Sequence, residues 1–216
     1  MNEHHLGVPR TARFFTLGDE RAFTSADVWF VLHGYGQLAR RFLRHFTALD
    51  DGTRLIVAPE GLSRFYLESG RNDQIGASWM TREDRLTEIG DYVRYLDAVY
   101  ARVGADVARR VTVLGFSQGT ATAARWLTQG TAQVQGVILW GGEVPPDLDL
   151  AAARERWSGI ELSLVAGSTD QFITPKVLAR DEARLRKHGI AYRVERFEGG
   201  HEIVPEVVRR MVEGHR

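Results

Sequence analysis

One segment near the middle of the chain constrains the fold more than any other. Residues 111–115 form an apolar run rich in β-branched side chains, and a helical pattern covers residues 118–127. Between them lies Gly115-Phe116-Ser117-Gln118-Gly119, a Gly-x-Ser-x-Gly motif. Its two glycines let neighbouring backbone approach where a side chain would clash, as a sharp turn requires. A buried strand that turns directly into a helix is typical of α/β proteins.

The same alternation of short strands and longer helices runs along most of the chain. The pattern predicts an α/β fold, with a mostly parallel central sheet flanked by helices on both faces. The predicted core strands are residues 28–32, 55–59, 111–115, 137–140, 162–167 and 192–197. The predicted helices are residues 38–48, 86–103, 118–127, 175–188 and 205–212.

Three further expectations concern the organisation of the chain. Residues 13–17 and 21–23, joined by Gly18-Asp19, predict an antiparallel hairpin at one edge of the sheet. Residues 61–84 predict a long irregular loop, and such loops are often functional. The 216 residues, 44% of them apolar, suffice for one sizeable core but barely for two. We therefore expect a single α/β-hydrolase domain over residues 1–216.

Composition excludes several classes of protein. Basic and acidic residues number 28 each, so no excess positive charge is available for nucleic acid. Without cysteine, the chain has no disulfide, thiolate metal site or thiol nucleophile. No apolar run approaches the roughly 18 residues of a membrane span, and residues 1–7 lack the features of a secretory signal. We expect a cytoplasmic protein with no nucleic-acid partner and no integral membrane segment.

Ser117 is the candidate nucleophile, and it needs a base. A serine hydroxyl attacks well only if a histidine within hydrogen-bond reach accepts its proton. Of the seven histidines, His201 follows the last predicted strand through Gly199-Gly200, on a loop that can cross the carboxyl edge of the sheet. The others lie near the termini, in or at the end of helices, or, for His33, in a separate loop. The sequence therefore predicts His201 as the general base.

The acid that orients His201 should lie between the serine and the histidine. The α/β-hydrolase fold carries its residues in the order Ser, acid, His. Asp170 comes after the predicted strand 162–167, and Glu143 follows the earlier strand 137–140 through Gly141-Gly142. We favour Asp170, because its strand is later and its carboxylate is shorter, and keep Glu143 as the alternative.

Attack on an ester also creates an oxyanion, which needs hydrogen-bond donors already in place. His33-Gly34-Tyr35-Gly36-Gln37 follows the strand 28–32, where this fold supplies one amide, and the residue after the nucleophile supplies the other. We assign the backbone amides of Tyr35 and Gln118, whose side chains are incidental to this role. As a dinucleotide fingerprint the same segment fails, because the third glycine and a distal acidic residue are missing.

These motifs, in this order, resemble the phospholipase/carboxylesterase family, which includes acyl-protein thioesterases and small bacterial carboxylesterases. The resemblance runs from about Phe30 to His201 and implies a catalytic triad of Ser117, Asp170 and His201. It also implies that Tyr35 and Gln118 line the oxyanion hole. The matching residues are 32–36, 58–59, 115–119, 166–170 and 199–201.

The chain departs from the family pattern near the expected substrate pocket. Gln37 stands where an acid is usual, Thr120 stands where a further glycine is usual, and Ser78-Trp79-Met80-Thr81 replaces Ser-Trp-Phe-Asp or similar. Two interpretations stay open for the neighbouring apolar residues: they wall a cleft above Ser117, or they cap the core beneath the long loop. The pocket candidates are Trp79, Met80, Phe65 and Tyr66. Arg71, Arg82 and Arg85 fit a solvated charged face better than a substrate anion.

The sequence predicts a serine hydrolase that cleaves carboxylic esters through an acyl-enzyme on Ser117. The expected substrate is a small-molecule ester or thioester, and neither a metal nor a cofactor is implied. Lysophospholipase or acyl-protein thioesterase activity is an alternative that needs a longer acyl channel. A non-catalytic homologue that binds a small ligand is an alternative of another class, because fold alone does not prove chemistry. Apolar residues near the long loop are candidates for a homodimer contact, as in some relatives.

Overall fold

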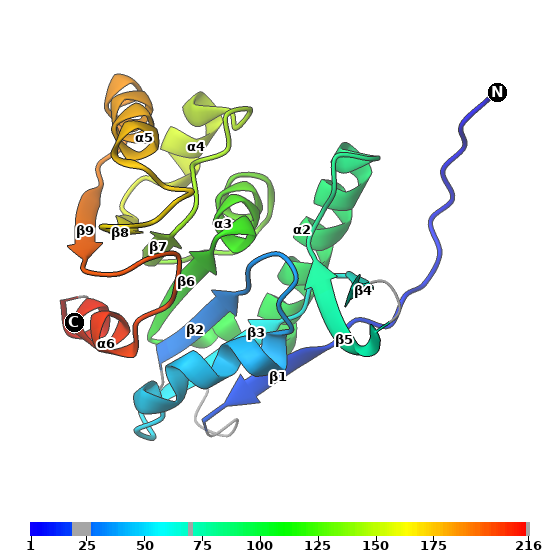
Figure 1. The fold of residues 1–216 in the computed structure, drawn as a ribbon, viewed down its shortest axis with the longest axis horizontal. Helices are drawn as coiled ribbons and strands as arrows, with labels where there is room; N and C mark the ends of the chain where they lie inside the picture. Colours follow the sequence, from blue (N-terminus) through cyan, green and yellow to red (C-terminus); the bar gives the residue numbers. More distant parts are fainter. Residues whose placement is uncertain (19–26, 69–70, 215–216) are drawn as a thin grey trace.

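A mostly parallel sheet forms the centre of the molecule. The computed structural model describes residues 1–18, 27–68 and 71–214. The strands of the central sheet are β1 (Phe14–Leu17), β2 (Asp27–Leu32), β3 (Arg54–Pro59), β6 (Arg110–Phe116), β7 (Gly136–Trp140), β8 (Glu161–Gly167) and β9 (Arg193–Phe197). Their order is β1-β3-β2-β6-β7-β8-β9 (Figure 1). Only the β1–β3 pair is antiparallel among these described strands, so the predicted fold class is confirmed.

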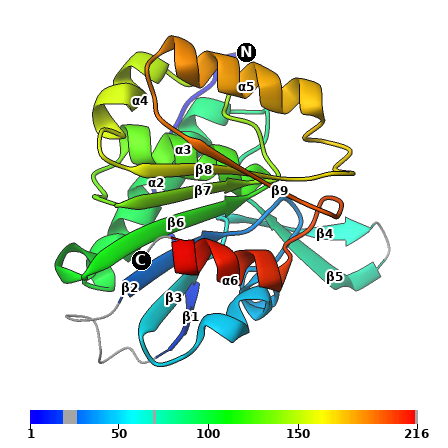
Figure 2. The same ribbon diagram turned by 90° about the vertical axis from the view of Figure 1, so that its left-hand side faces the viewer.

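Helices cover both faces of this sheet (Figure 2). Four pack with one apolar cluster, and the remaining α-helices pack with a second cluster on the opposite face. The first group is α2 (Arg85–Arg102), α3 (Gln118–Gln129), α4 (Leu150–Arg156) and α5 (Pro175–Lys187). The second group is α1 (Ala39–Phe42), continued by the 3-10 helix η1 (Leu43–Leu49), and α6 (Pro205–Gly214). A short 3-10 helix, η2 (Ala105–Val107), follows α2.

Inner strands such as β2 and β7 are largely apolar because both faces of the sheet are covered there, whereas the edge strand β9 is polar at three of its five residues. In β2, Val28 and Phe30 point into the first cluster, whereas Trp29 and Val31 point into the second. All four side chains are at most 3% exposed. Alternation of apolar and polar residues is absent from such a strand, since neither face meets water. The six predicted core strands are confirmed to within one residue at each end.

Some expectations about the connecting segments were wrong. The region predicted as an irregular loop contains an antiparallel hairpin of β4 (Ser63–Glu68) and β5 (Arg71–Ser78), in which Ser63 pairs with Ser78. β4 is largely exposed, so it lacks the apolar run by which a buried strand is recognised. The prediction for residues 38–48 was also partly wrong, because the α-helix ends at Phe42 and continues as η1.

Two further differences lie at an edge of the sheet and before β8. β1 pairs with β3, and the second arm of the predicted edge hairpin, residues 21–23, lies outside the described residues. Helix α4 was not predicted, although Asp149 marks its start by accepting hydrogen bonds from the amides of Ala151 and Ala152. Among the described helices, none combines the length and apolar character required to cross a membrane.

Asp147 ties helices α2 and α3 together, and its removal should destabilise the fold. Its carboxylate pairs with Arg85 and with Arg125, whose guanidinium is nearly buried. Burial opposes ionisation of Asp147, but the two arginines outweigh it and lower its pKa to about 2. Asp147→Asn leaves Arg125 buried without a counter-charge, and because Asp147 itself is half-exposed we expect a loss of about 2 kcal/mol in unfolding free energy.

Urea unfolding of wild type and Asp147→Asn at several pH values measures this expected loss of unfolding free energy. Because the pKa is lowered on folding, the contribution of Asp147 is full above about pH 4 and shrinks as the pH falls towards 2. Asp91→Asn, in the exposed pair with Arg94, is the matched control and should cost less than about 0.5 kcal/mol. Equal losses of unfolding free energy in the two variants would show that the pair of Asp147 with Arg125 contributes no more than an exposed ion pair.

Candidate active site

Ser117 stands at a strained turn between β6 and α3. Its backbone has φ 55° and ψ −115°, values that side-chain-bearing residues rarely adopt. A Cβ on Gly115 would lie 2.2 Å from the carbonyl oxygen of Gly119, and a Cβ on Gly119 would lie 2.2 Å from that of Leu32. Both glycines of the motif are therefore required by close backbone contacts, and the turn exposes the serine hydroxyl above the carboxyl edge of the sheet.

Three side chains from distant segments meet at this turn. The Oγ of Ser117 lies 3.0 Å from Nε2 of His201, and Nδ1 of His201 lies 2.9 Å from Oδ2 of Asp170. An ionised carboxylate only accepts hydrogen bonds, so Nδ1 carries the proton and Nε2 is left to accept one from Ser117. The predicted nucleophile, base and favoured acid thus lie in one hydrogen-bonded chain.

Asp170 is held in its ionised form. Its side chain is 1% exposed, and burial by itself would favour the neutral acid. The other oxygen, Oδ1, accepts hydrogen bonds from the amides of Ile173 (3.0 Å) and Phe172 (2.8 Å). Together with His201, these donors outweigh burial and bring the pKa of Asp170 below its ordinary value.

Glu143, the alternative acid, lies elsewhere. Its carboxylate pairs with Arg180 on α5, and within the described part of the chain it has no contact with His201. His33, which the sequence placed in a separate loop, is fully buried. Its Nε2 accepts the amide of Gly61 at 2.9 Å and its Nδ1 donates to the Gly34 carbonyl at 2.8 Å, while burial lowers its pKa. This neutral ring fixes the turn that follows β2.

That turn is tied down on both sides. Gly36 donates its amide to the carbonyl of Ala77 on β5, and Ala77 donates to the carbonyl of Gln37. The side chain of Gln37 accepts the amide of Gly34 at 2.7 Å. In the described chain no acceptor takes the amide of Tyr35, and Gly34 packs directly against the serine, since a Cβ at Gly34 would lie 3.2 Å from the serine Cβ. The residue before Tyr35 thus lies against the nucleophile, and the Tyr35 amide has no acceptor in the described chain.

The side chain of Gln118 makes hydrogen bonds that were not predicted from the sequence. Its Oε1 accepts the amide of Trp79 at 3.0 Å, and its Nε2 donates to the carbonyl of Met80 at 2.7 Å. The backbone amide of Gln118 opens α3, whose N-terminus favours nearby negative charge. One residue therefore joins the serine turn to the segment after β5. A long polar side chain after the nucleophile was the only sequence signal for this link.

The four pocket candidates lie in different environments in the structure. Trp79 is 1% exposed, stacks on His33 and donates its Nε1 hydrogen to the His33 carbonyl, so it caps the core. Met80 is half-buried, with its sulfur 3.7 Å from Arg125. Phe65 packs against the ring of Tyr35 at 5.2 Å, whereas Tyr66 is exposed. Phe65, which packs on Tyr35, and Met80, whose carbonyl bonds to the side chain of Gln118, remain wall candidates.

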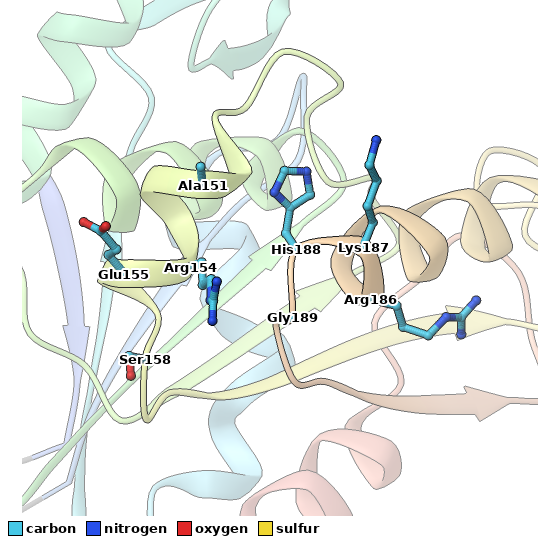
Figure 3. A pocket seen from close by; sticks show the side chains of 8 residues that line it. All are labelled: Ala151, Arg154, Glu155, Ser158, Arg186, Lys187, His188 and Gly189. Carbon is cyan, nitrogen blue, oxygen red and sulfur yellow. The ribbon is translucent and has the colours of Figure 1, made fainter.

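Two other features could attract a ligand. Glu3, His5 and Asp84 bring metal-binding atoms within 4.8 Å of one another, but all three are exposed, and both carboxylates already lie within 3.5 Å of Nε2 of His5. A cavity of about 740 Å³ lies between the C-terminal ends of α4 and α5. Its charged side chains point in different directions (Figure 3). These helix ends precede β8 and β9, so the cavity is at the opposite edge of the sheet from Ser117.

Comparison with known proteins identifies the family. The model of the phospholipase/carboxylesterase family matches residues 84–214, more than half of the chain. The chain belongs to this family. It is thus a hydrolase of the phospholipase/carboxylesterase type, as the resemblance in its motifs predicted. Among curated proteins no match was found.

Several solved structures of esterases and a thioesterase have the same fold as this chain. Acyl-protein thioesterase 2 of Zea mays superposes with a TM-score of 0.71 at 18% identity, over 95% of this chain and 99% of that one. A carboxylesterase from Mesorhizobium loti gives a TM-score of 0.69 at 21% identity, over 94% of both chains. Esterase PE8 gives 0.69 at 18% identity, over 96% of this chain and all of that one. These likenesses establish the α/β-hydrolase fold over nearly the whole chain.

Proposed function

We propose that the protein hydrolyses carboxylic esters through an acyl-enzyme on Ser117. The observation that carries this proposal is the continuous chain from Ser117 Oγ to His201 Nε2 (3.0 Å) and from His201 Nδ1 to Asp170 Oδ2 (2.9 Å). A serine on a strained turn, a neutral imidazole acceptor and an ionised carboxylate are the groups that covalent acyl transfer needs. Membership of an esterase family supports the same reaction class.

The steps follow from the positions of these atoms. As Ser117 Oγ attacks the ester carbonyl, its proton passes to Nε2 of His201, and Asp170 stabilises the imidazolium that forms. The amides of Tyr35 and Gln118 stabilise the negative oxygen of the tetrahedral intermediate. His201 then gives the proton to the departing alcohol, leaving the acyl group on Ser117. A water molecule, activated by His201, attacks that acyl-enzyme and releases the acid.

Thioester hydrolysis is the second candidate. One similar structure is that of an acyl-protein thioesterase, and a thioester carbonyl can be attacked by the same serine. Phe65 and Tyr35 pack together on the hairpin side of the serine turn, so an acyl chain has an apolar surface there. The length of acyl chain that the site prefers separates a small-ester hydrolase from a hydrolase of long lipid chains.

Two measurements test the proposal. Initial rates on p-nitrophenyl esters of two to sixteen carbons should show hydrolysis. We expect a maximum at short chains because buried Trp79 and half-buried Met80 are tied to Gln118 beside the nucleophile. A fluorophosphonate should label the wild type at Ser117, as located by peptide mass spectrometry. Ser158→Ala, at the remote end of α4, should keep full labelling.

The outcomes discriminate between the candidate functions. A rate maximum at long chains favours a lipid-chain hydrolase over a small-ester hydrolase. Activity restricted to thioesters supports the second candidate. A protein that is unlabelled and inactive on both substrate classes is better described as a ligand-binding homologue, and the proposal then fails.

A further inference from the structure

Phe172 is an exposed aromatic residue that contacts His201. It lies in the loop between β8 and α5, and its side chain is 59% exposed. The centroid of its ring is 4.6 Å from that of His201, with an angle of 64° between the planes. An aromatic ring left in water gains little for folding, because burial is what makes such rings stabilising. Its position against the imidazole therefore needs another explanation.

The backbone of Phe172 is fixed by the acid that orients His201. Oδ1 of Asp170 accepts the amide of Phe172 at 2.8 Å, while Oδ2 of the same carboxylate accepts Nδ1–H of His201 at 2.9 Å. The next residue, Ile173, is buried in the core, and Thr174 caps α5. The ring is thus attached to a stretch of loop whose backbone is held in place, and these contacts fix its position beside His201.

Two other residues lie against the imidazole of His201, whose side chain is 17% exposed. Phe116 packs on His201 with ring centroids 4.9 Å apart and is itself buried. At Gly141, a Cβ would lie 3.3 Å from the imidazole, so the backbone there is in close contact. Of these three described neighbours, Phe172 alone presents an exposed side chain. A group that passes the imidazole towards solvent meets Phe172.

The alcohol part of the ester is such a group. In the reaction proposed above, His201 protonates the leaving oxygen, which must therefore lie within hydrogen-bond reach of Nε2. The rest of the alcohol extends from that oxygen past the imidazole. We propose that Phe172 forms the leaving-group subsite and selects esters whose alcohol part is aromatic or otherwise apolar. This inference rests on the proposed ester hydrolysis and adds the class of alcohol.

Two esters that share the acetyl group but differ in their alcohol test the proposed leaving-group subsite. For Phe172→Ala, kcat/KM on benzyl acetate should fall about tenfold, mainly through KM, whereas kcat/KM on ethyl acetate should change less than about threefold. Phe172→Leu, which keeps an apolar side chain, should retain part of the preference. Leu86→Ala, an exposed apolar residue at the start of α2, should leave the ratio of the two rates unchanged.

Each result has one meaning. Equal losses on the two esters overturn the subsite and assign Phe172 to holding His201 alone. An unchanged ratio in Phe172→Ala, with wild-type hydrolysis that depends on Ser117, rejects this inference and keeps the proposed function. Failure of the wild type to hydrolyse either ester, together with absence of fluorophosphonate labelling, rejects both. Thermal unfolding of the variants near the wild-type temperature checks that the fold is retained.

Discussion

Replacing Ser117 with alanine is expected to abolish ester hydrolysis, lowering kcat by about 10⁶-fold. The change removes the only atom of the site that bonds to the acyl group, while His201 and Asp170 keep their own hydrogen bond. Rates on a p-nitrophenyl ester and fluorophosphonate labelling measure the loss. Activity within tenfold of wild type would mean that another group or a contaminant performs the reaction.

Ser117→Gly separates chemistry from strain at the same position. Glycine adopts the backbone angles of this turn (φ 55°, ψ −115°) without the steric cost that serine or alanine carries. It should be as inactive as Ser117→Ala but about 1 kcal/mol more stable than that variant, as read from urea unfolding. Equal stability of the two variants would argue that the turn stores no strain.

Asp170→Asn is expected to lower kcat by about 10⁴-fold. The amides of Phe172 and Ile173 donate to one carboxylate oxygen, so the oxygen of an asparagine should remain there and its NH₂ group should face His201. Nδ1 must then accept a hydrogen bond, which moves the imidazole proton to Nε2. In that tautomer His201 can no longer accept the proton of Ser117, and the imidazolium loses its counter-charge.

Glu143→Gln is the matched control for the acid. It makes the same carboxylate-to-amide change in an exposed residue that pairs with Arg180, and we expect kcat within about threefold of wild type. Steady-state rates of both variants, with circular dichroism to check folding, decide the matter. Similar losses in the two variants would reject Asp170 as the orienting acid.

Much of the fold was predictable because it is encoded over short distances. Most of the predicted core strands have nearly continuous apolar runs, and several helices have apolar periodicity or recognisable ends such as Thr174-Pro175. The turn at Ser117 is only partly local, since Gly115 avoids the carbonyl of nearby Gly119, whereas Gly119 makes room for the carbonyl of Leu32 on β2. The hairpin of β4 and β5 was missed because its two strands are joined by backbone hydrogen bonds. Such pairing requires no apolar pattern in side chains that are largely exposed, as those of β4 are.

The α/β fold, the position of Ser117 at its turn, and the order of serine, acid and histidine can be predicted from the sequence. The folded chain was needed to show that Asp170 rather than Glu143 contacts His201, that Trp79 enters the core, and that the side chain of Gln118 joins two segments. The physical reason is the range of the interactions. Backbone preference and apolar periodicity act within a few residues, whereas these side-chain contacts join segments 31 to 46 residues apart, whose meeting depends on how the whole sheet packs.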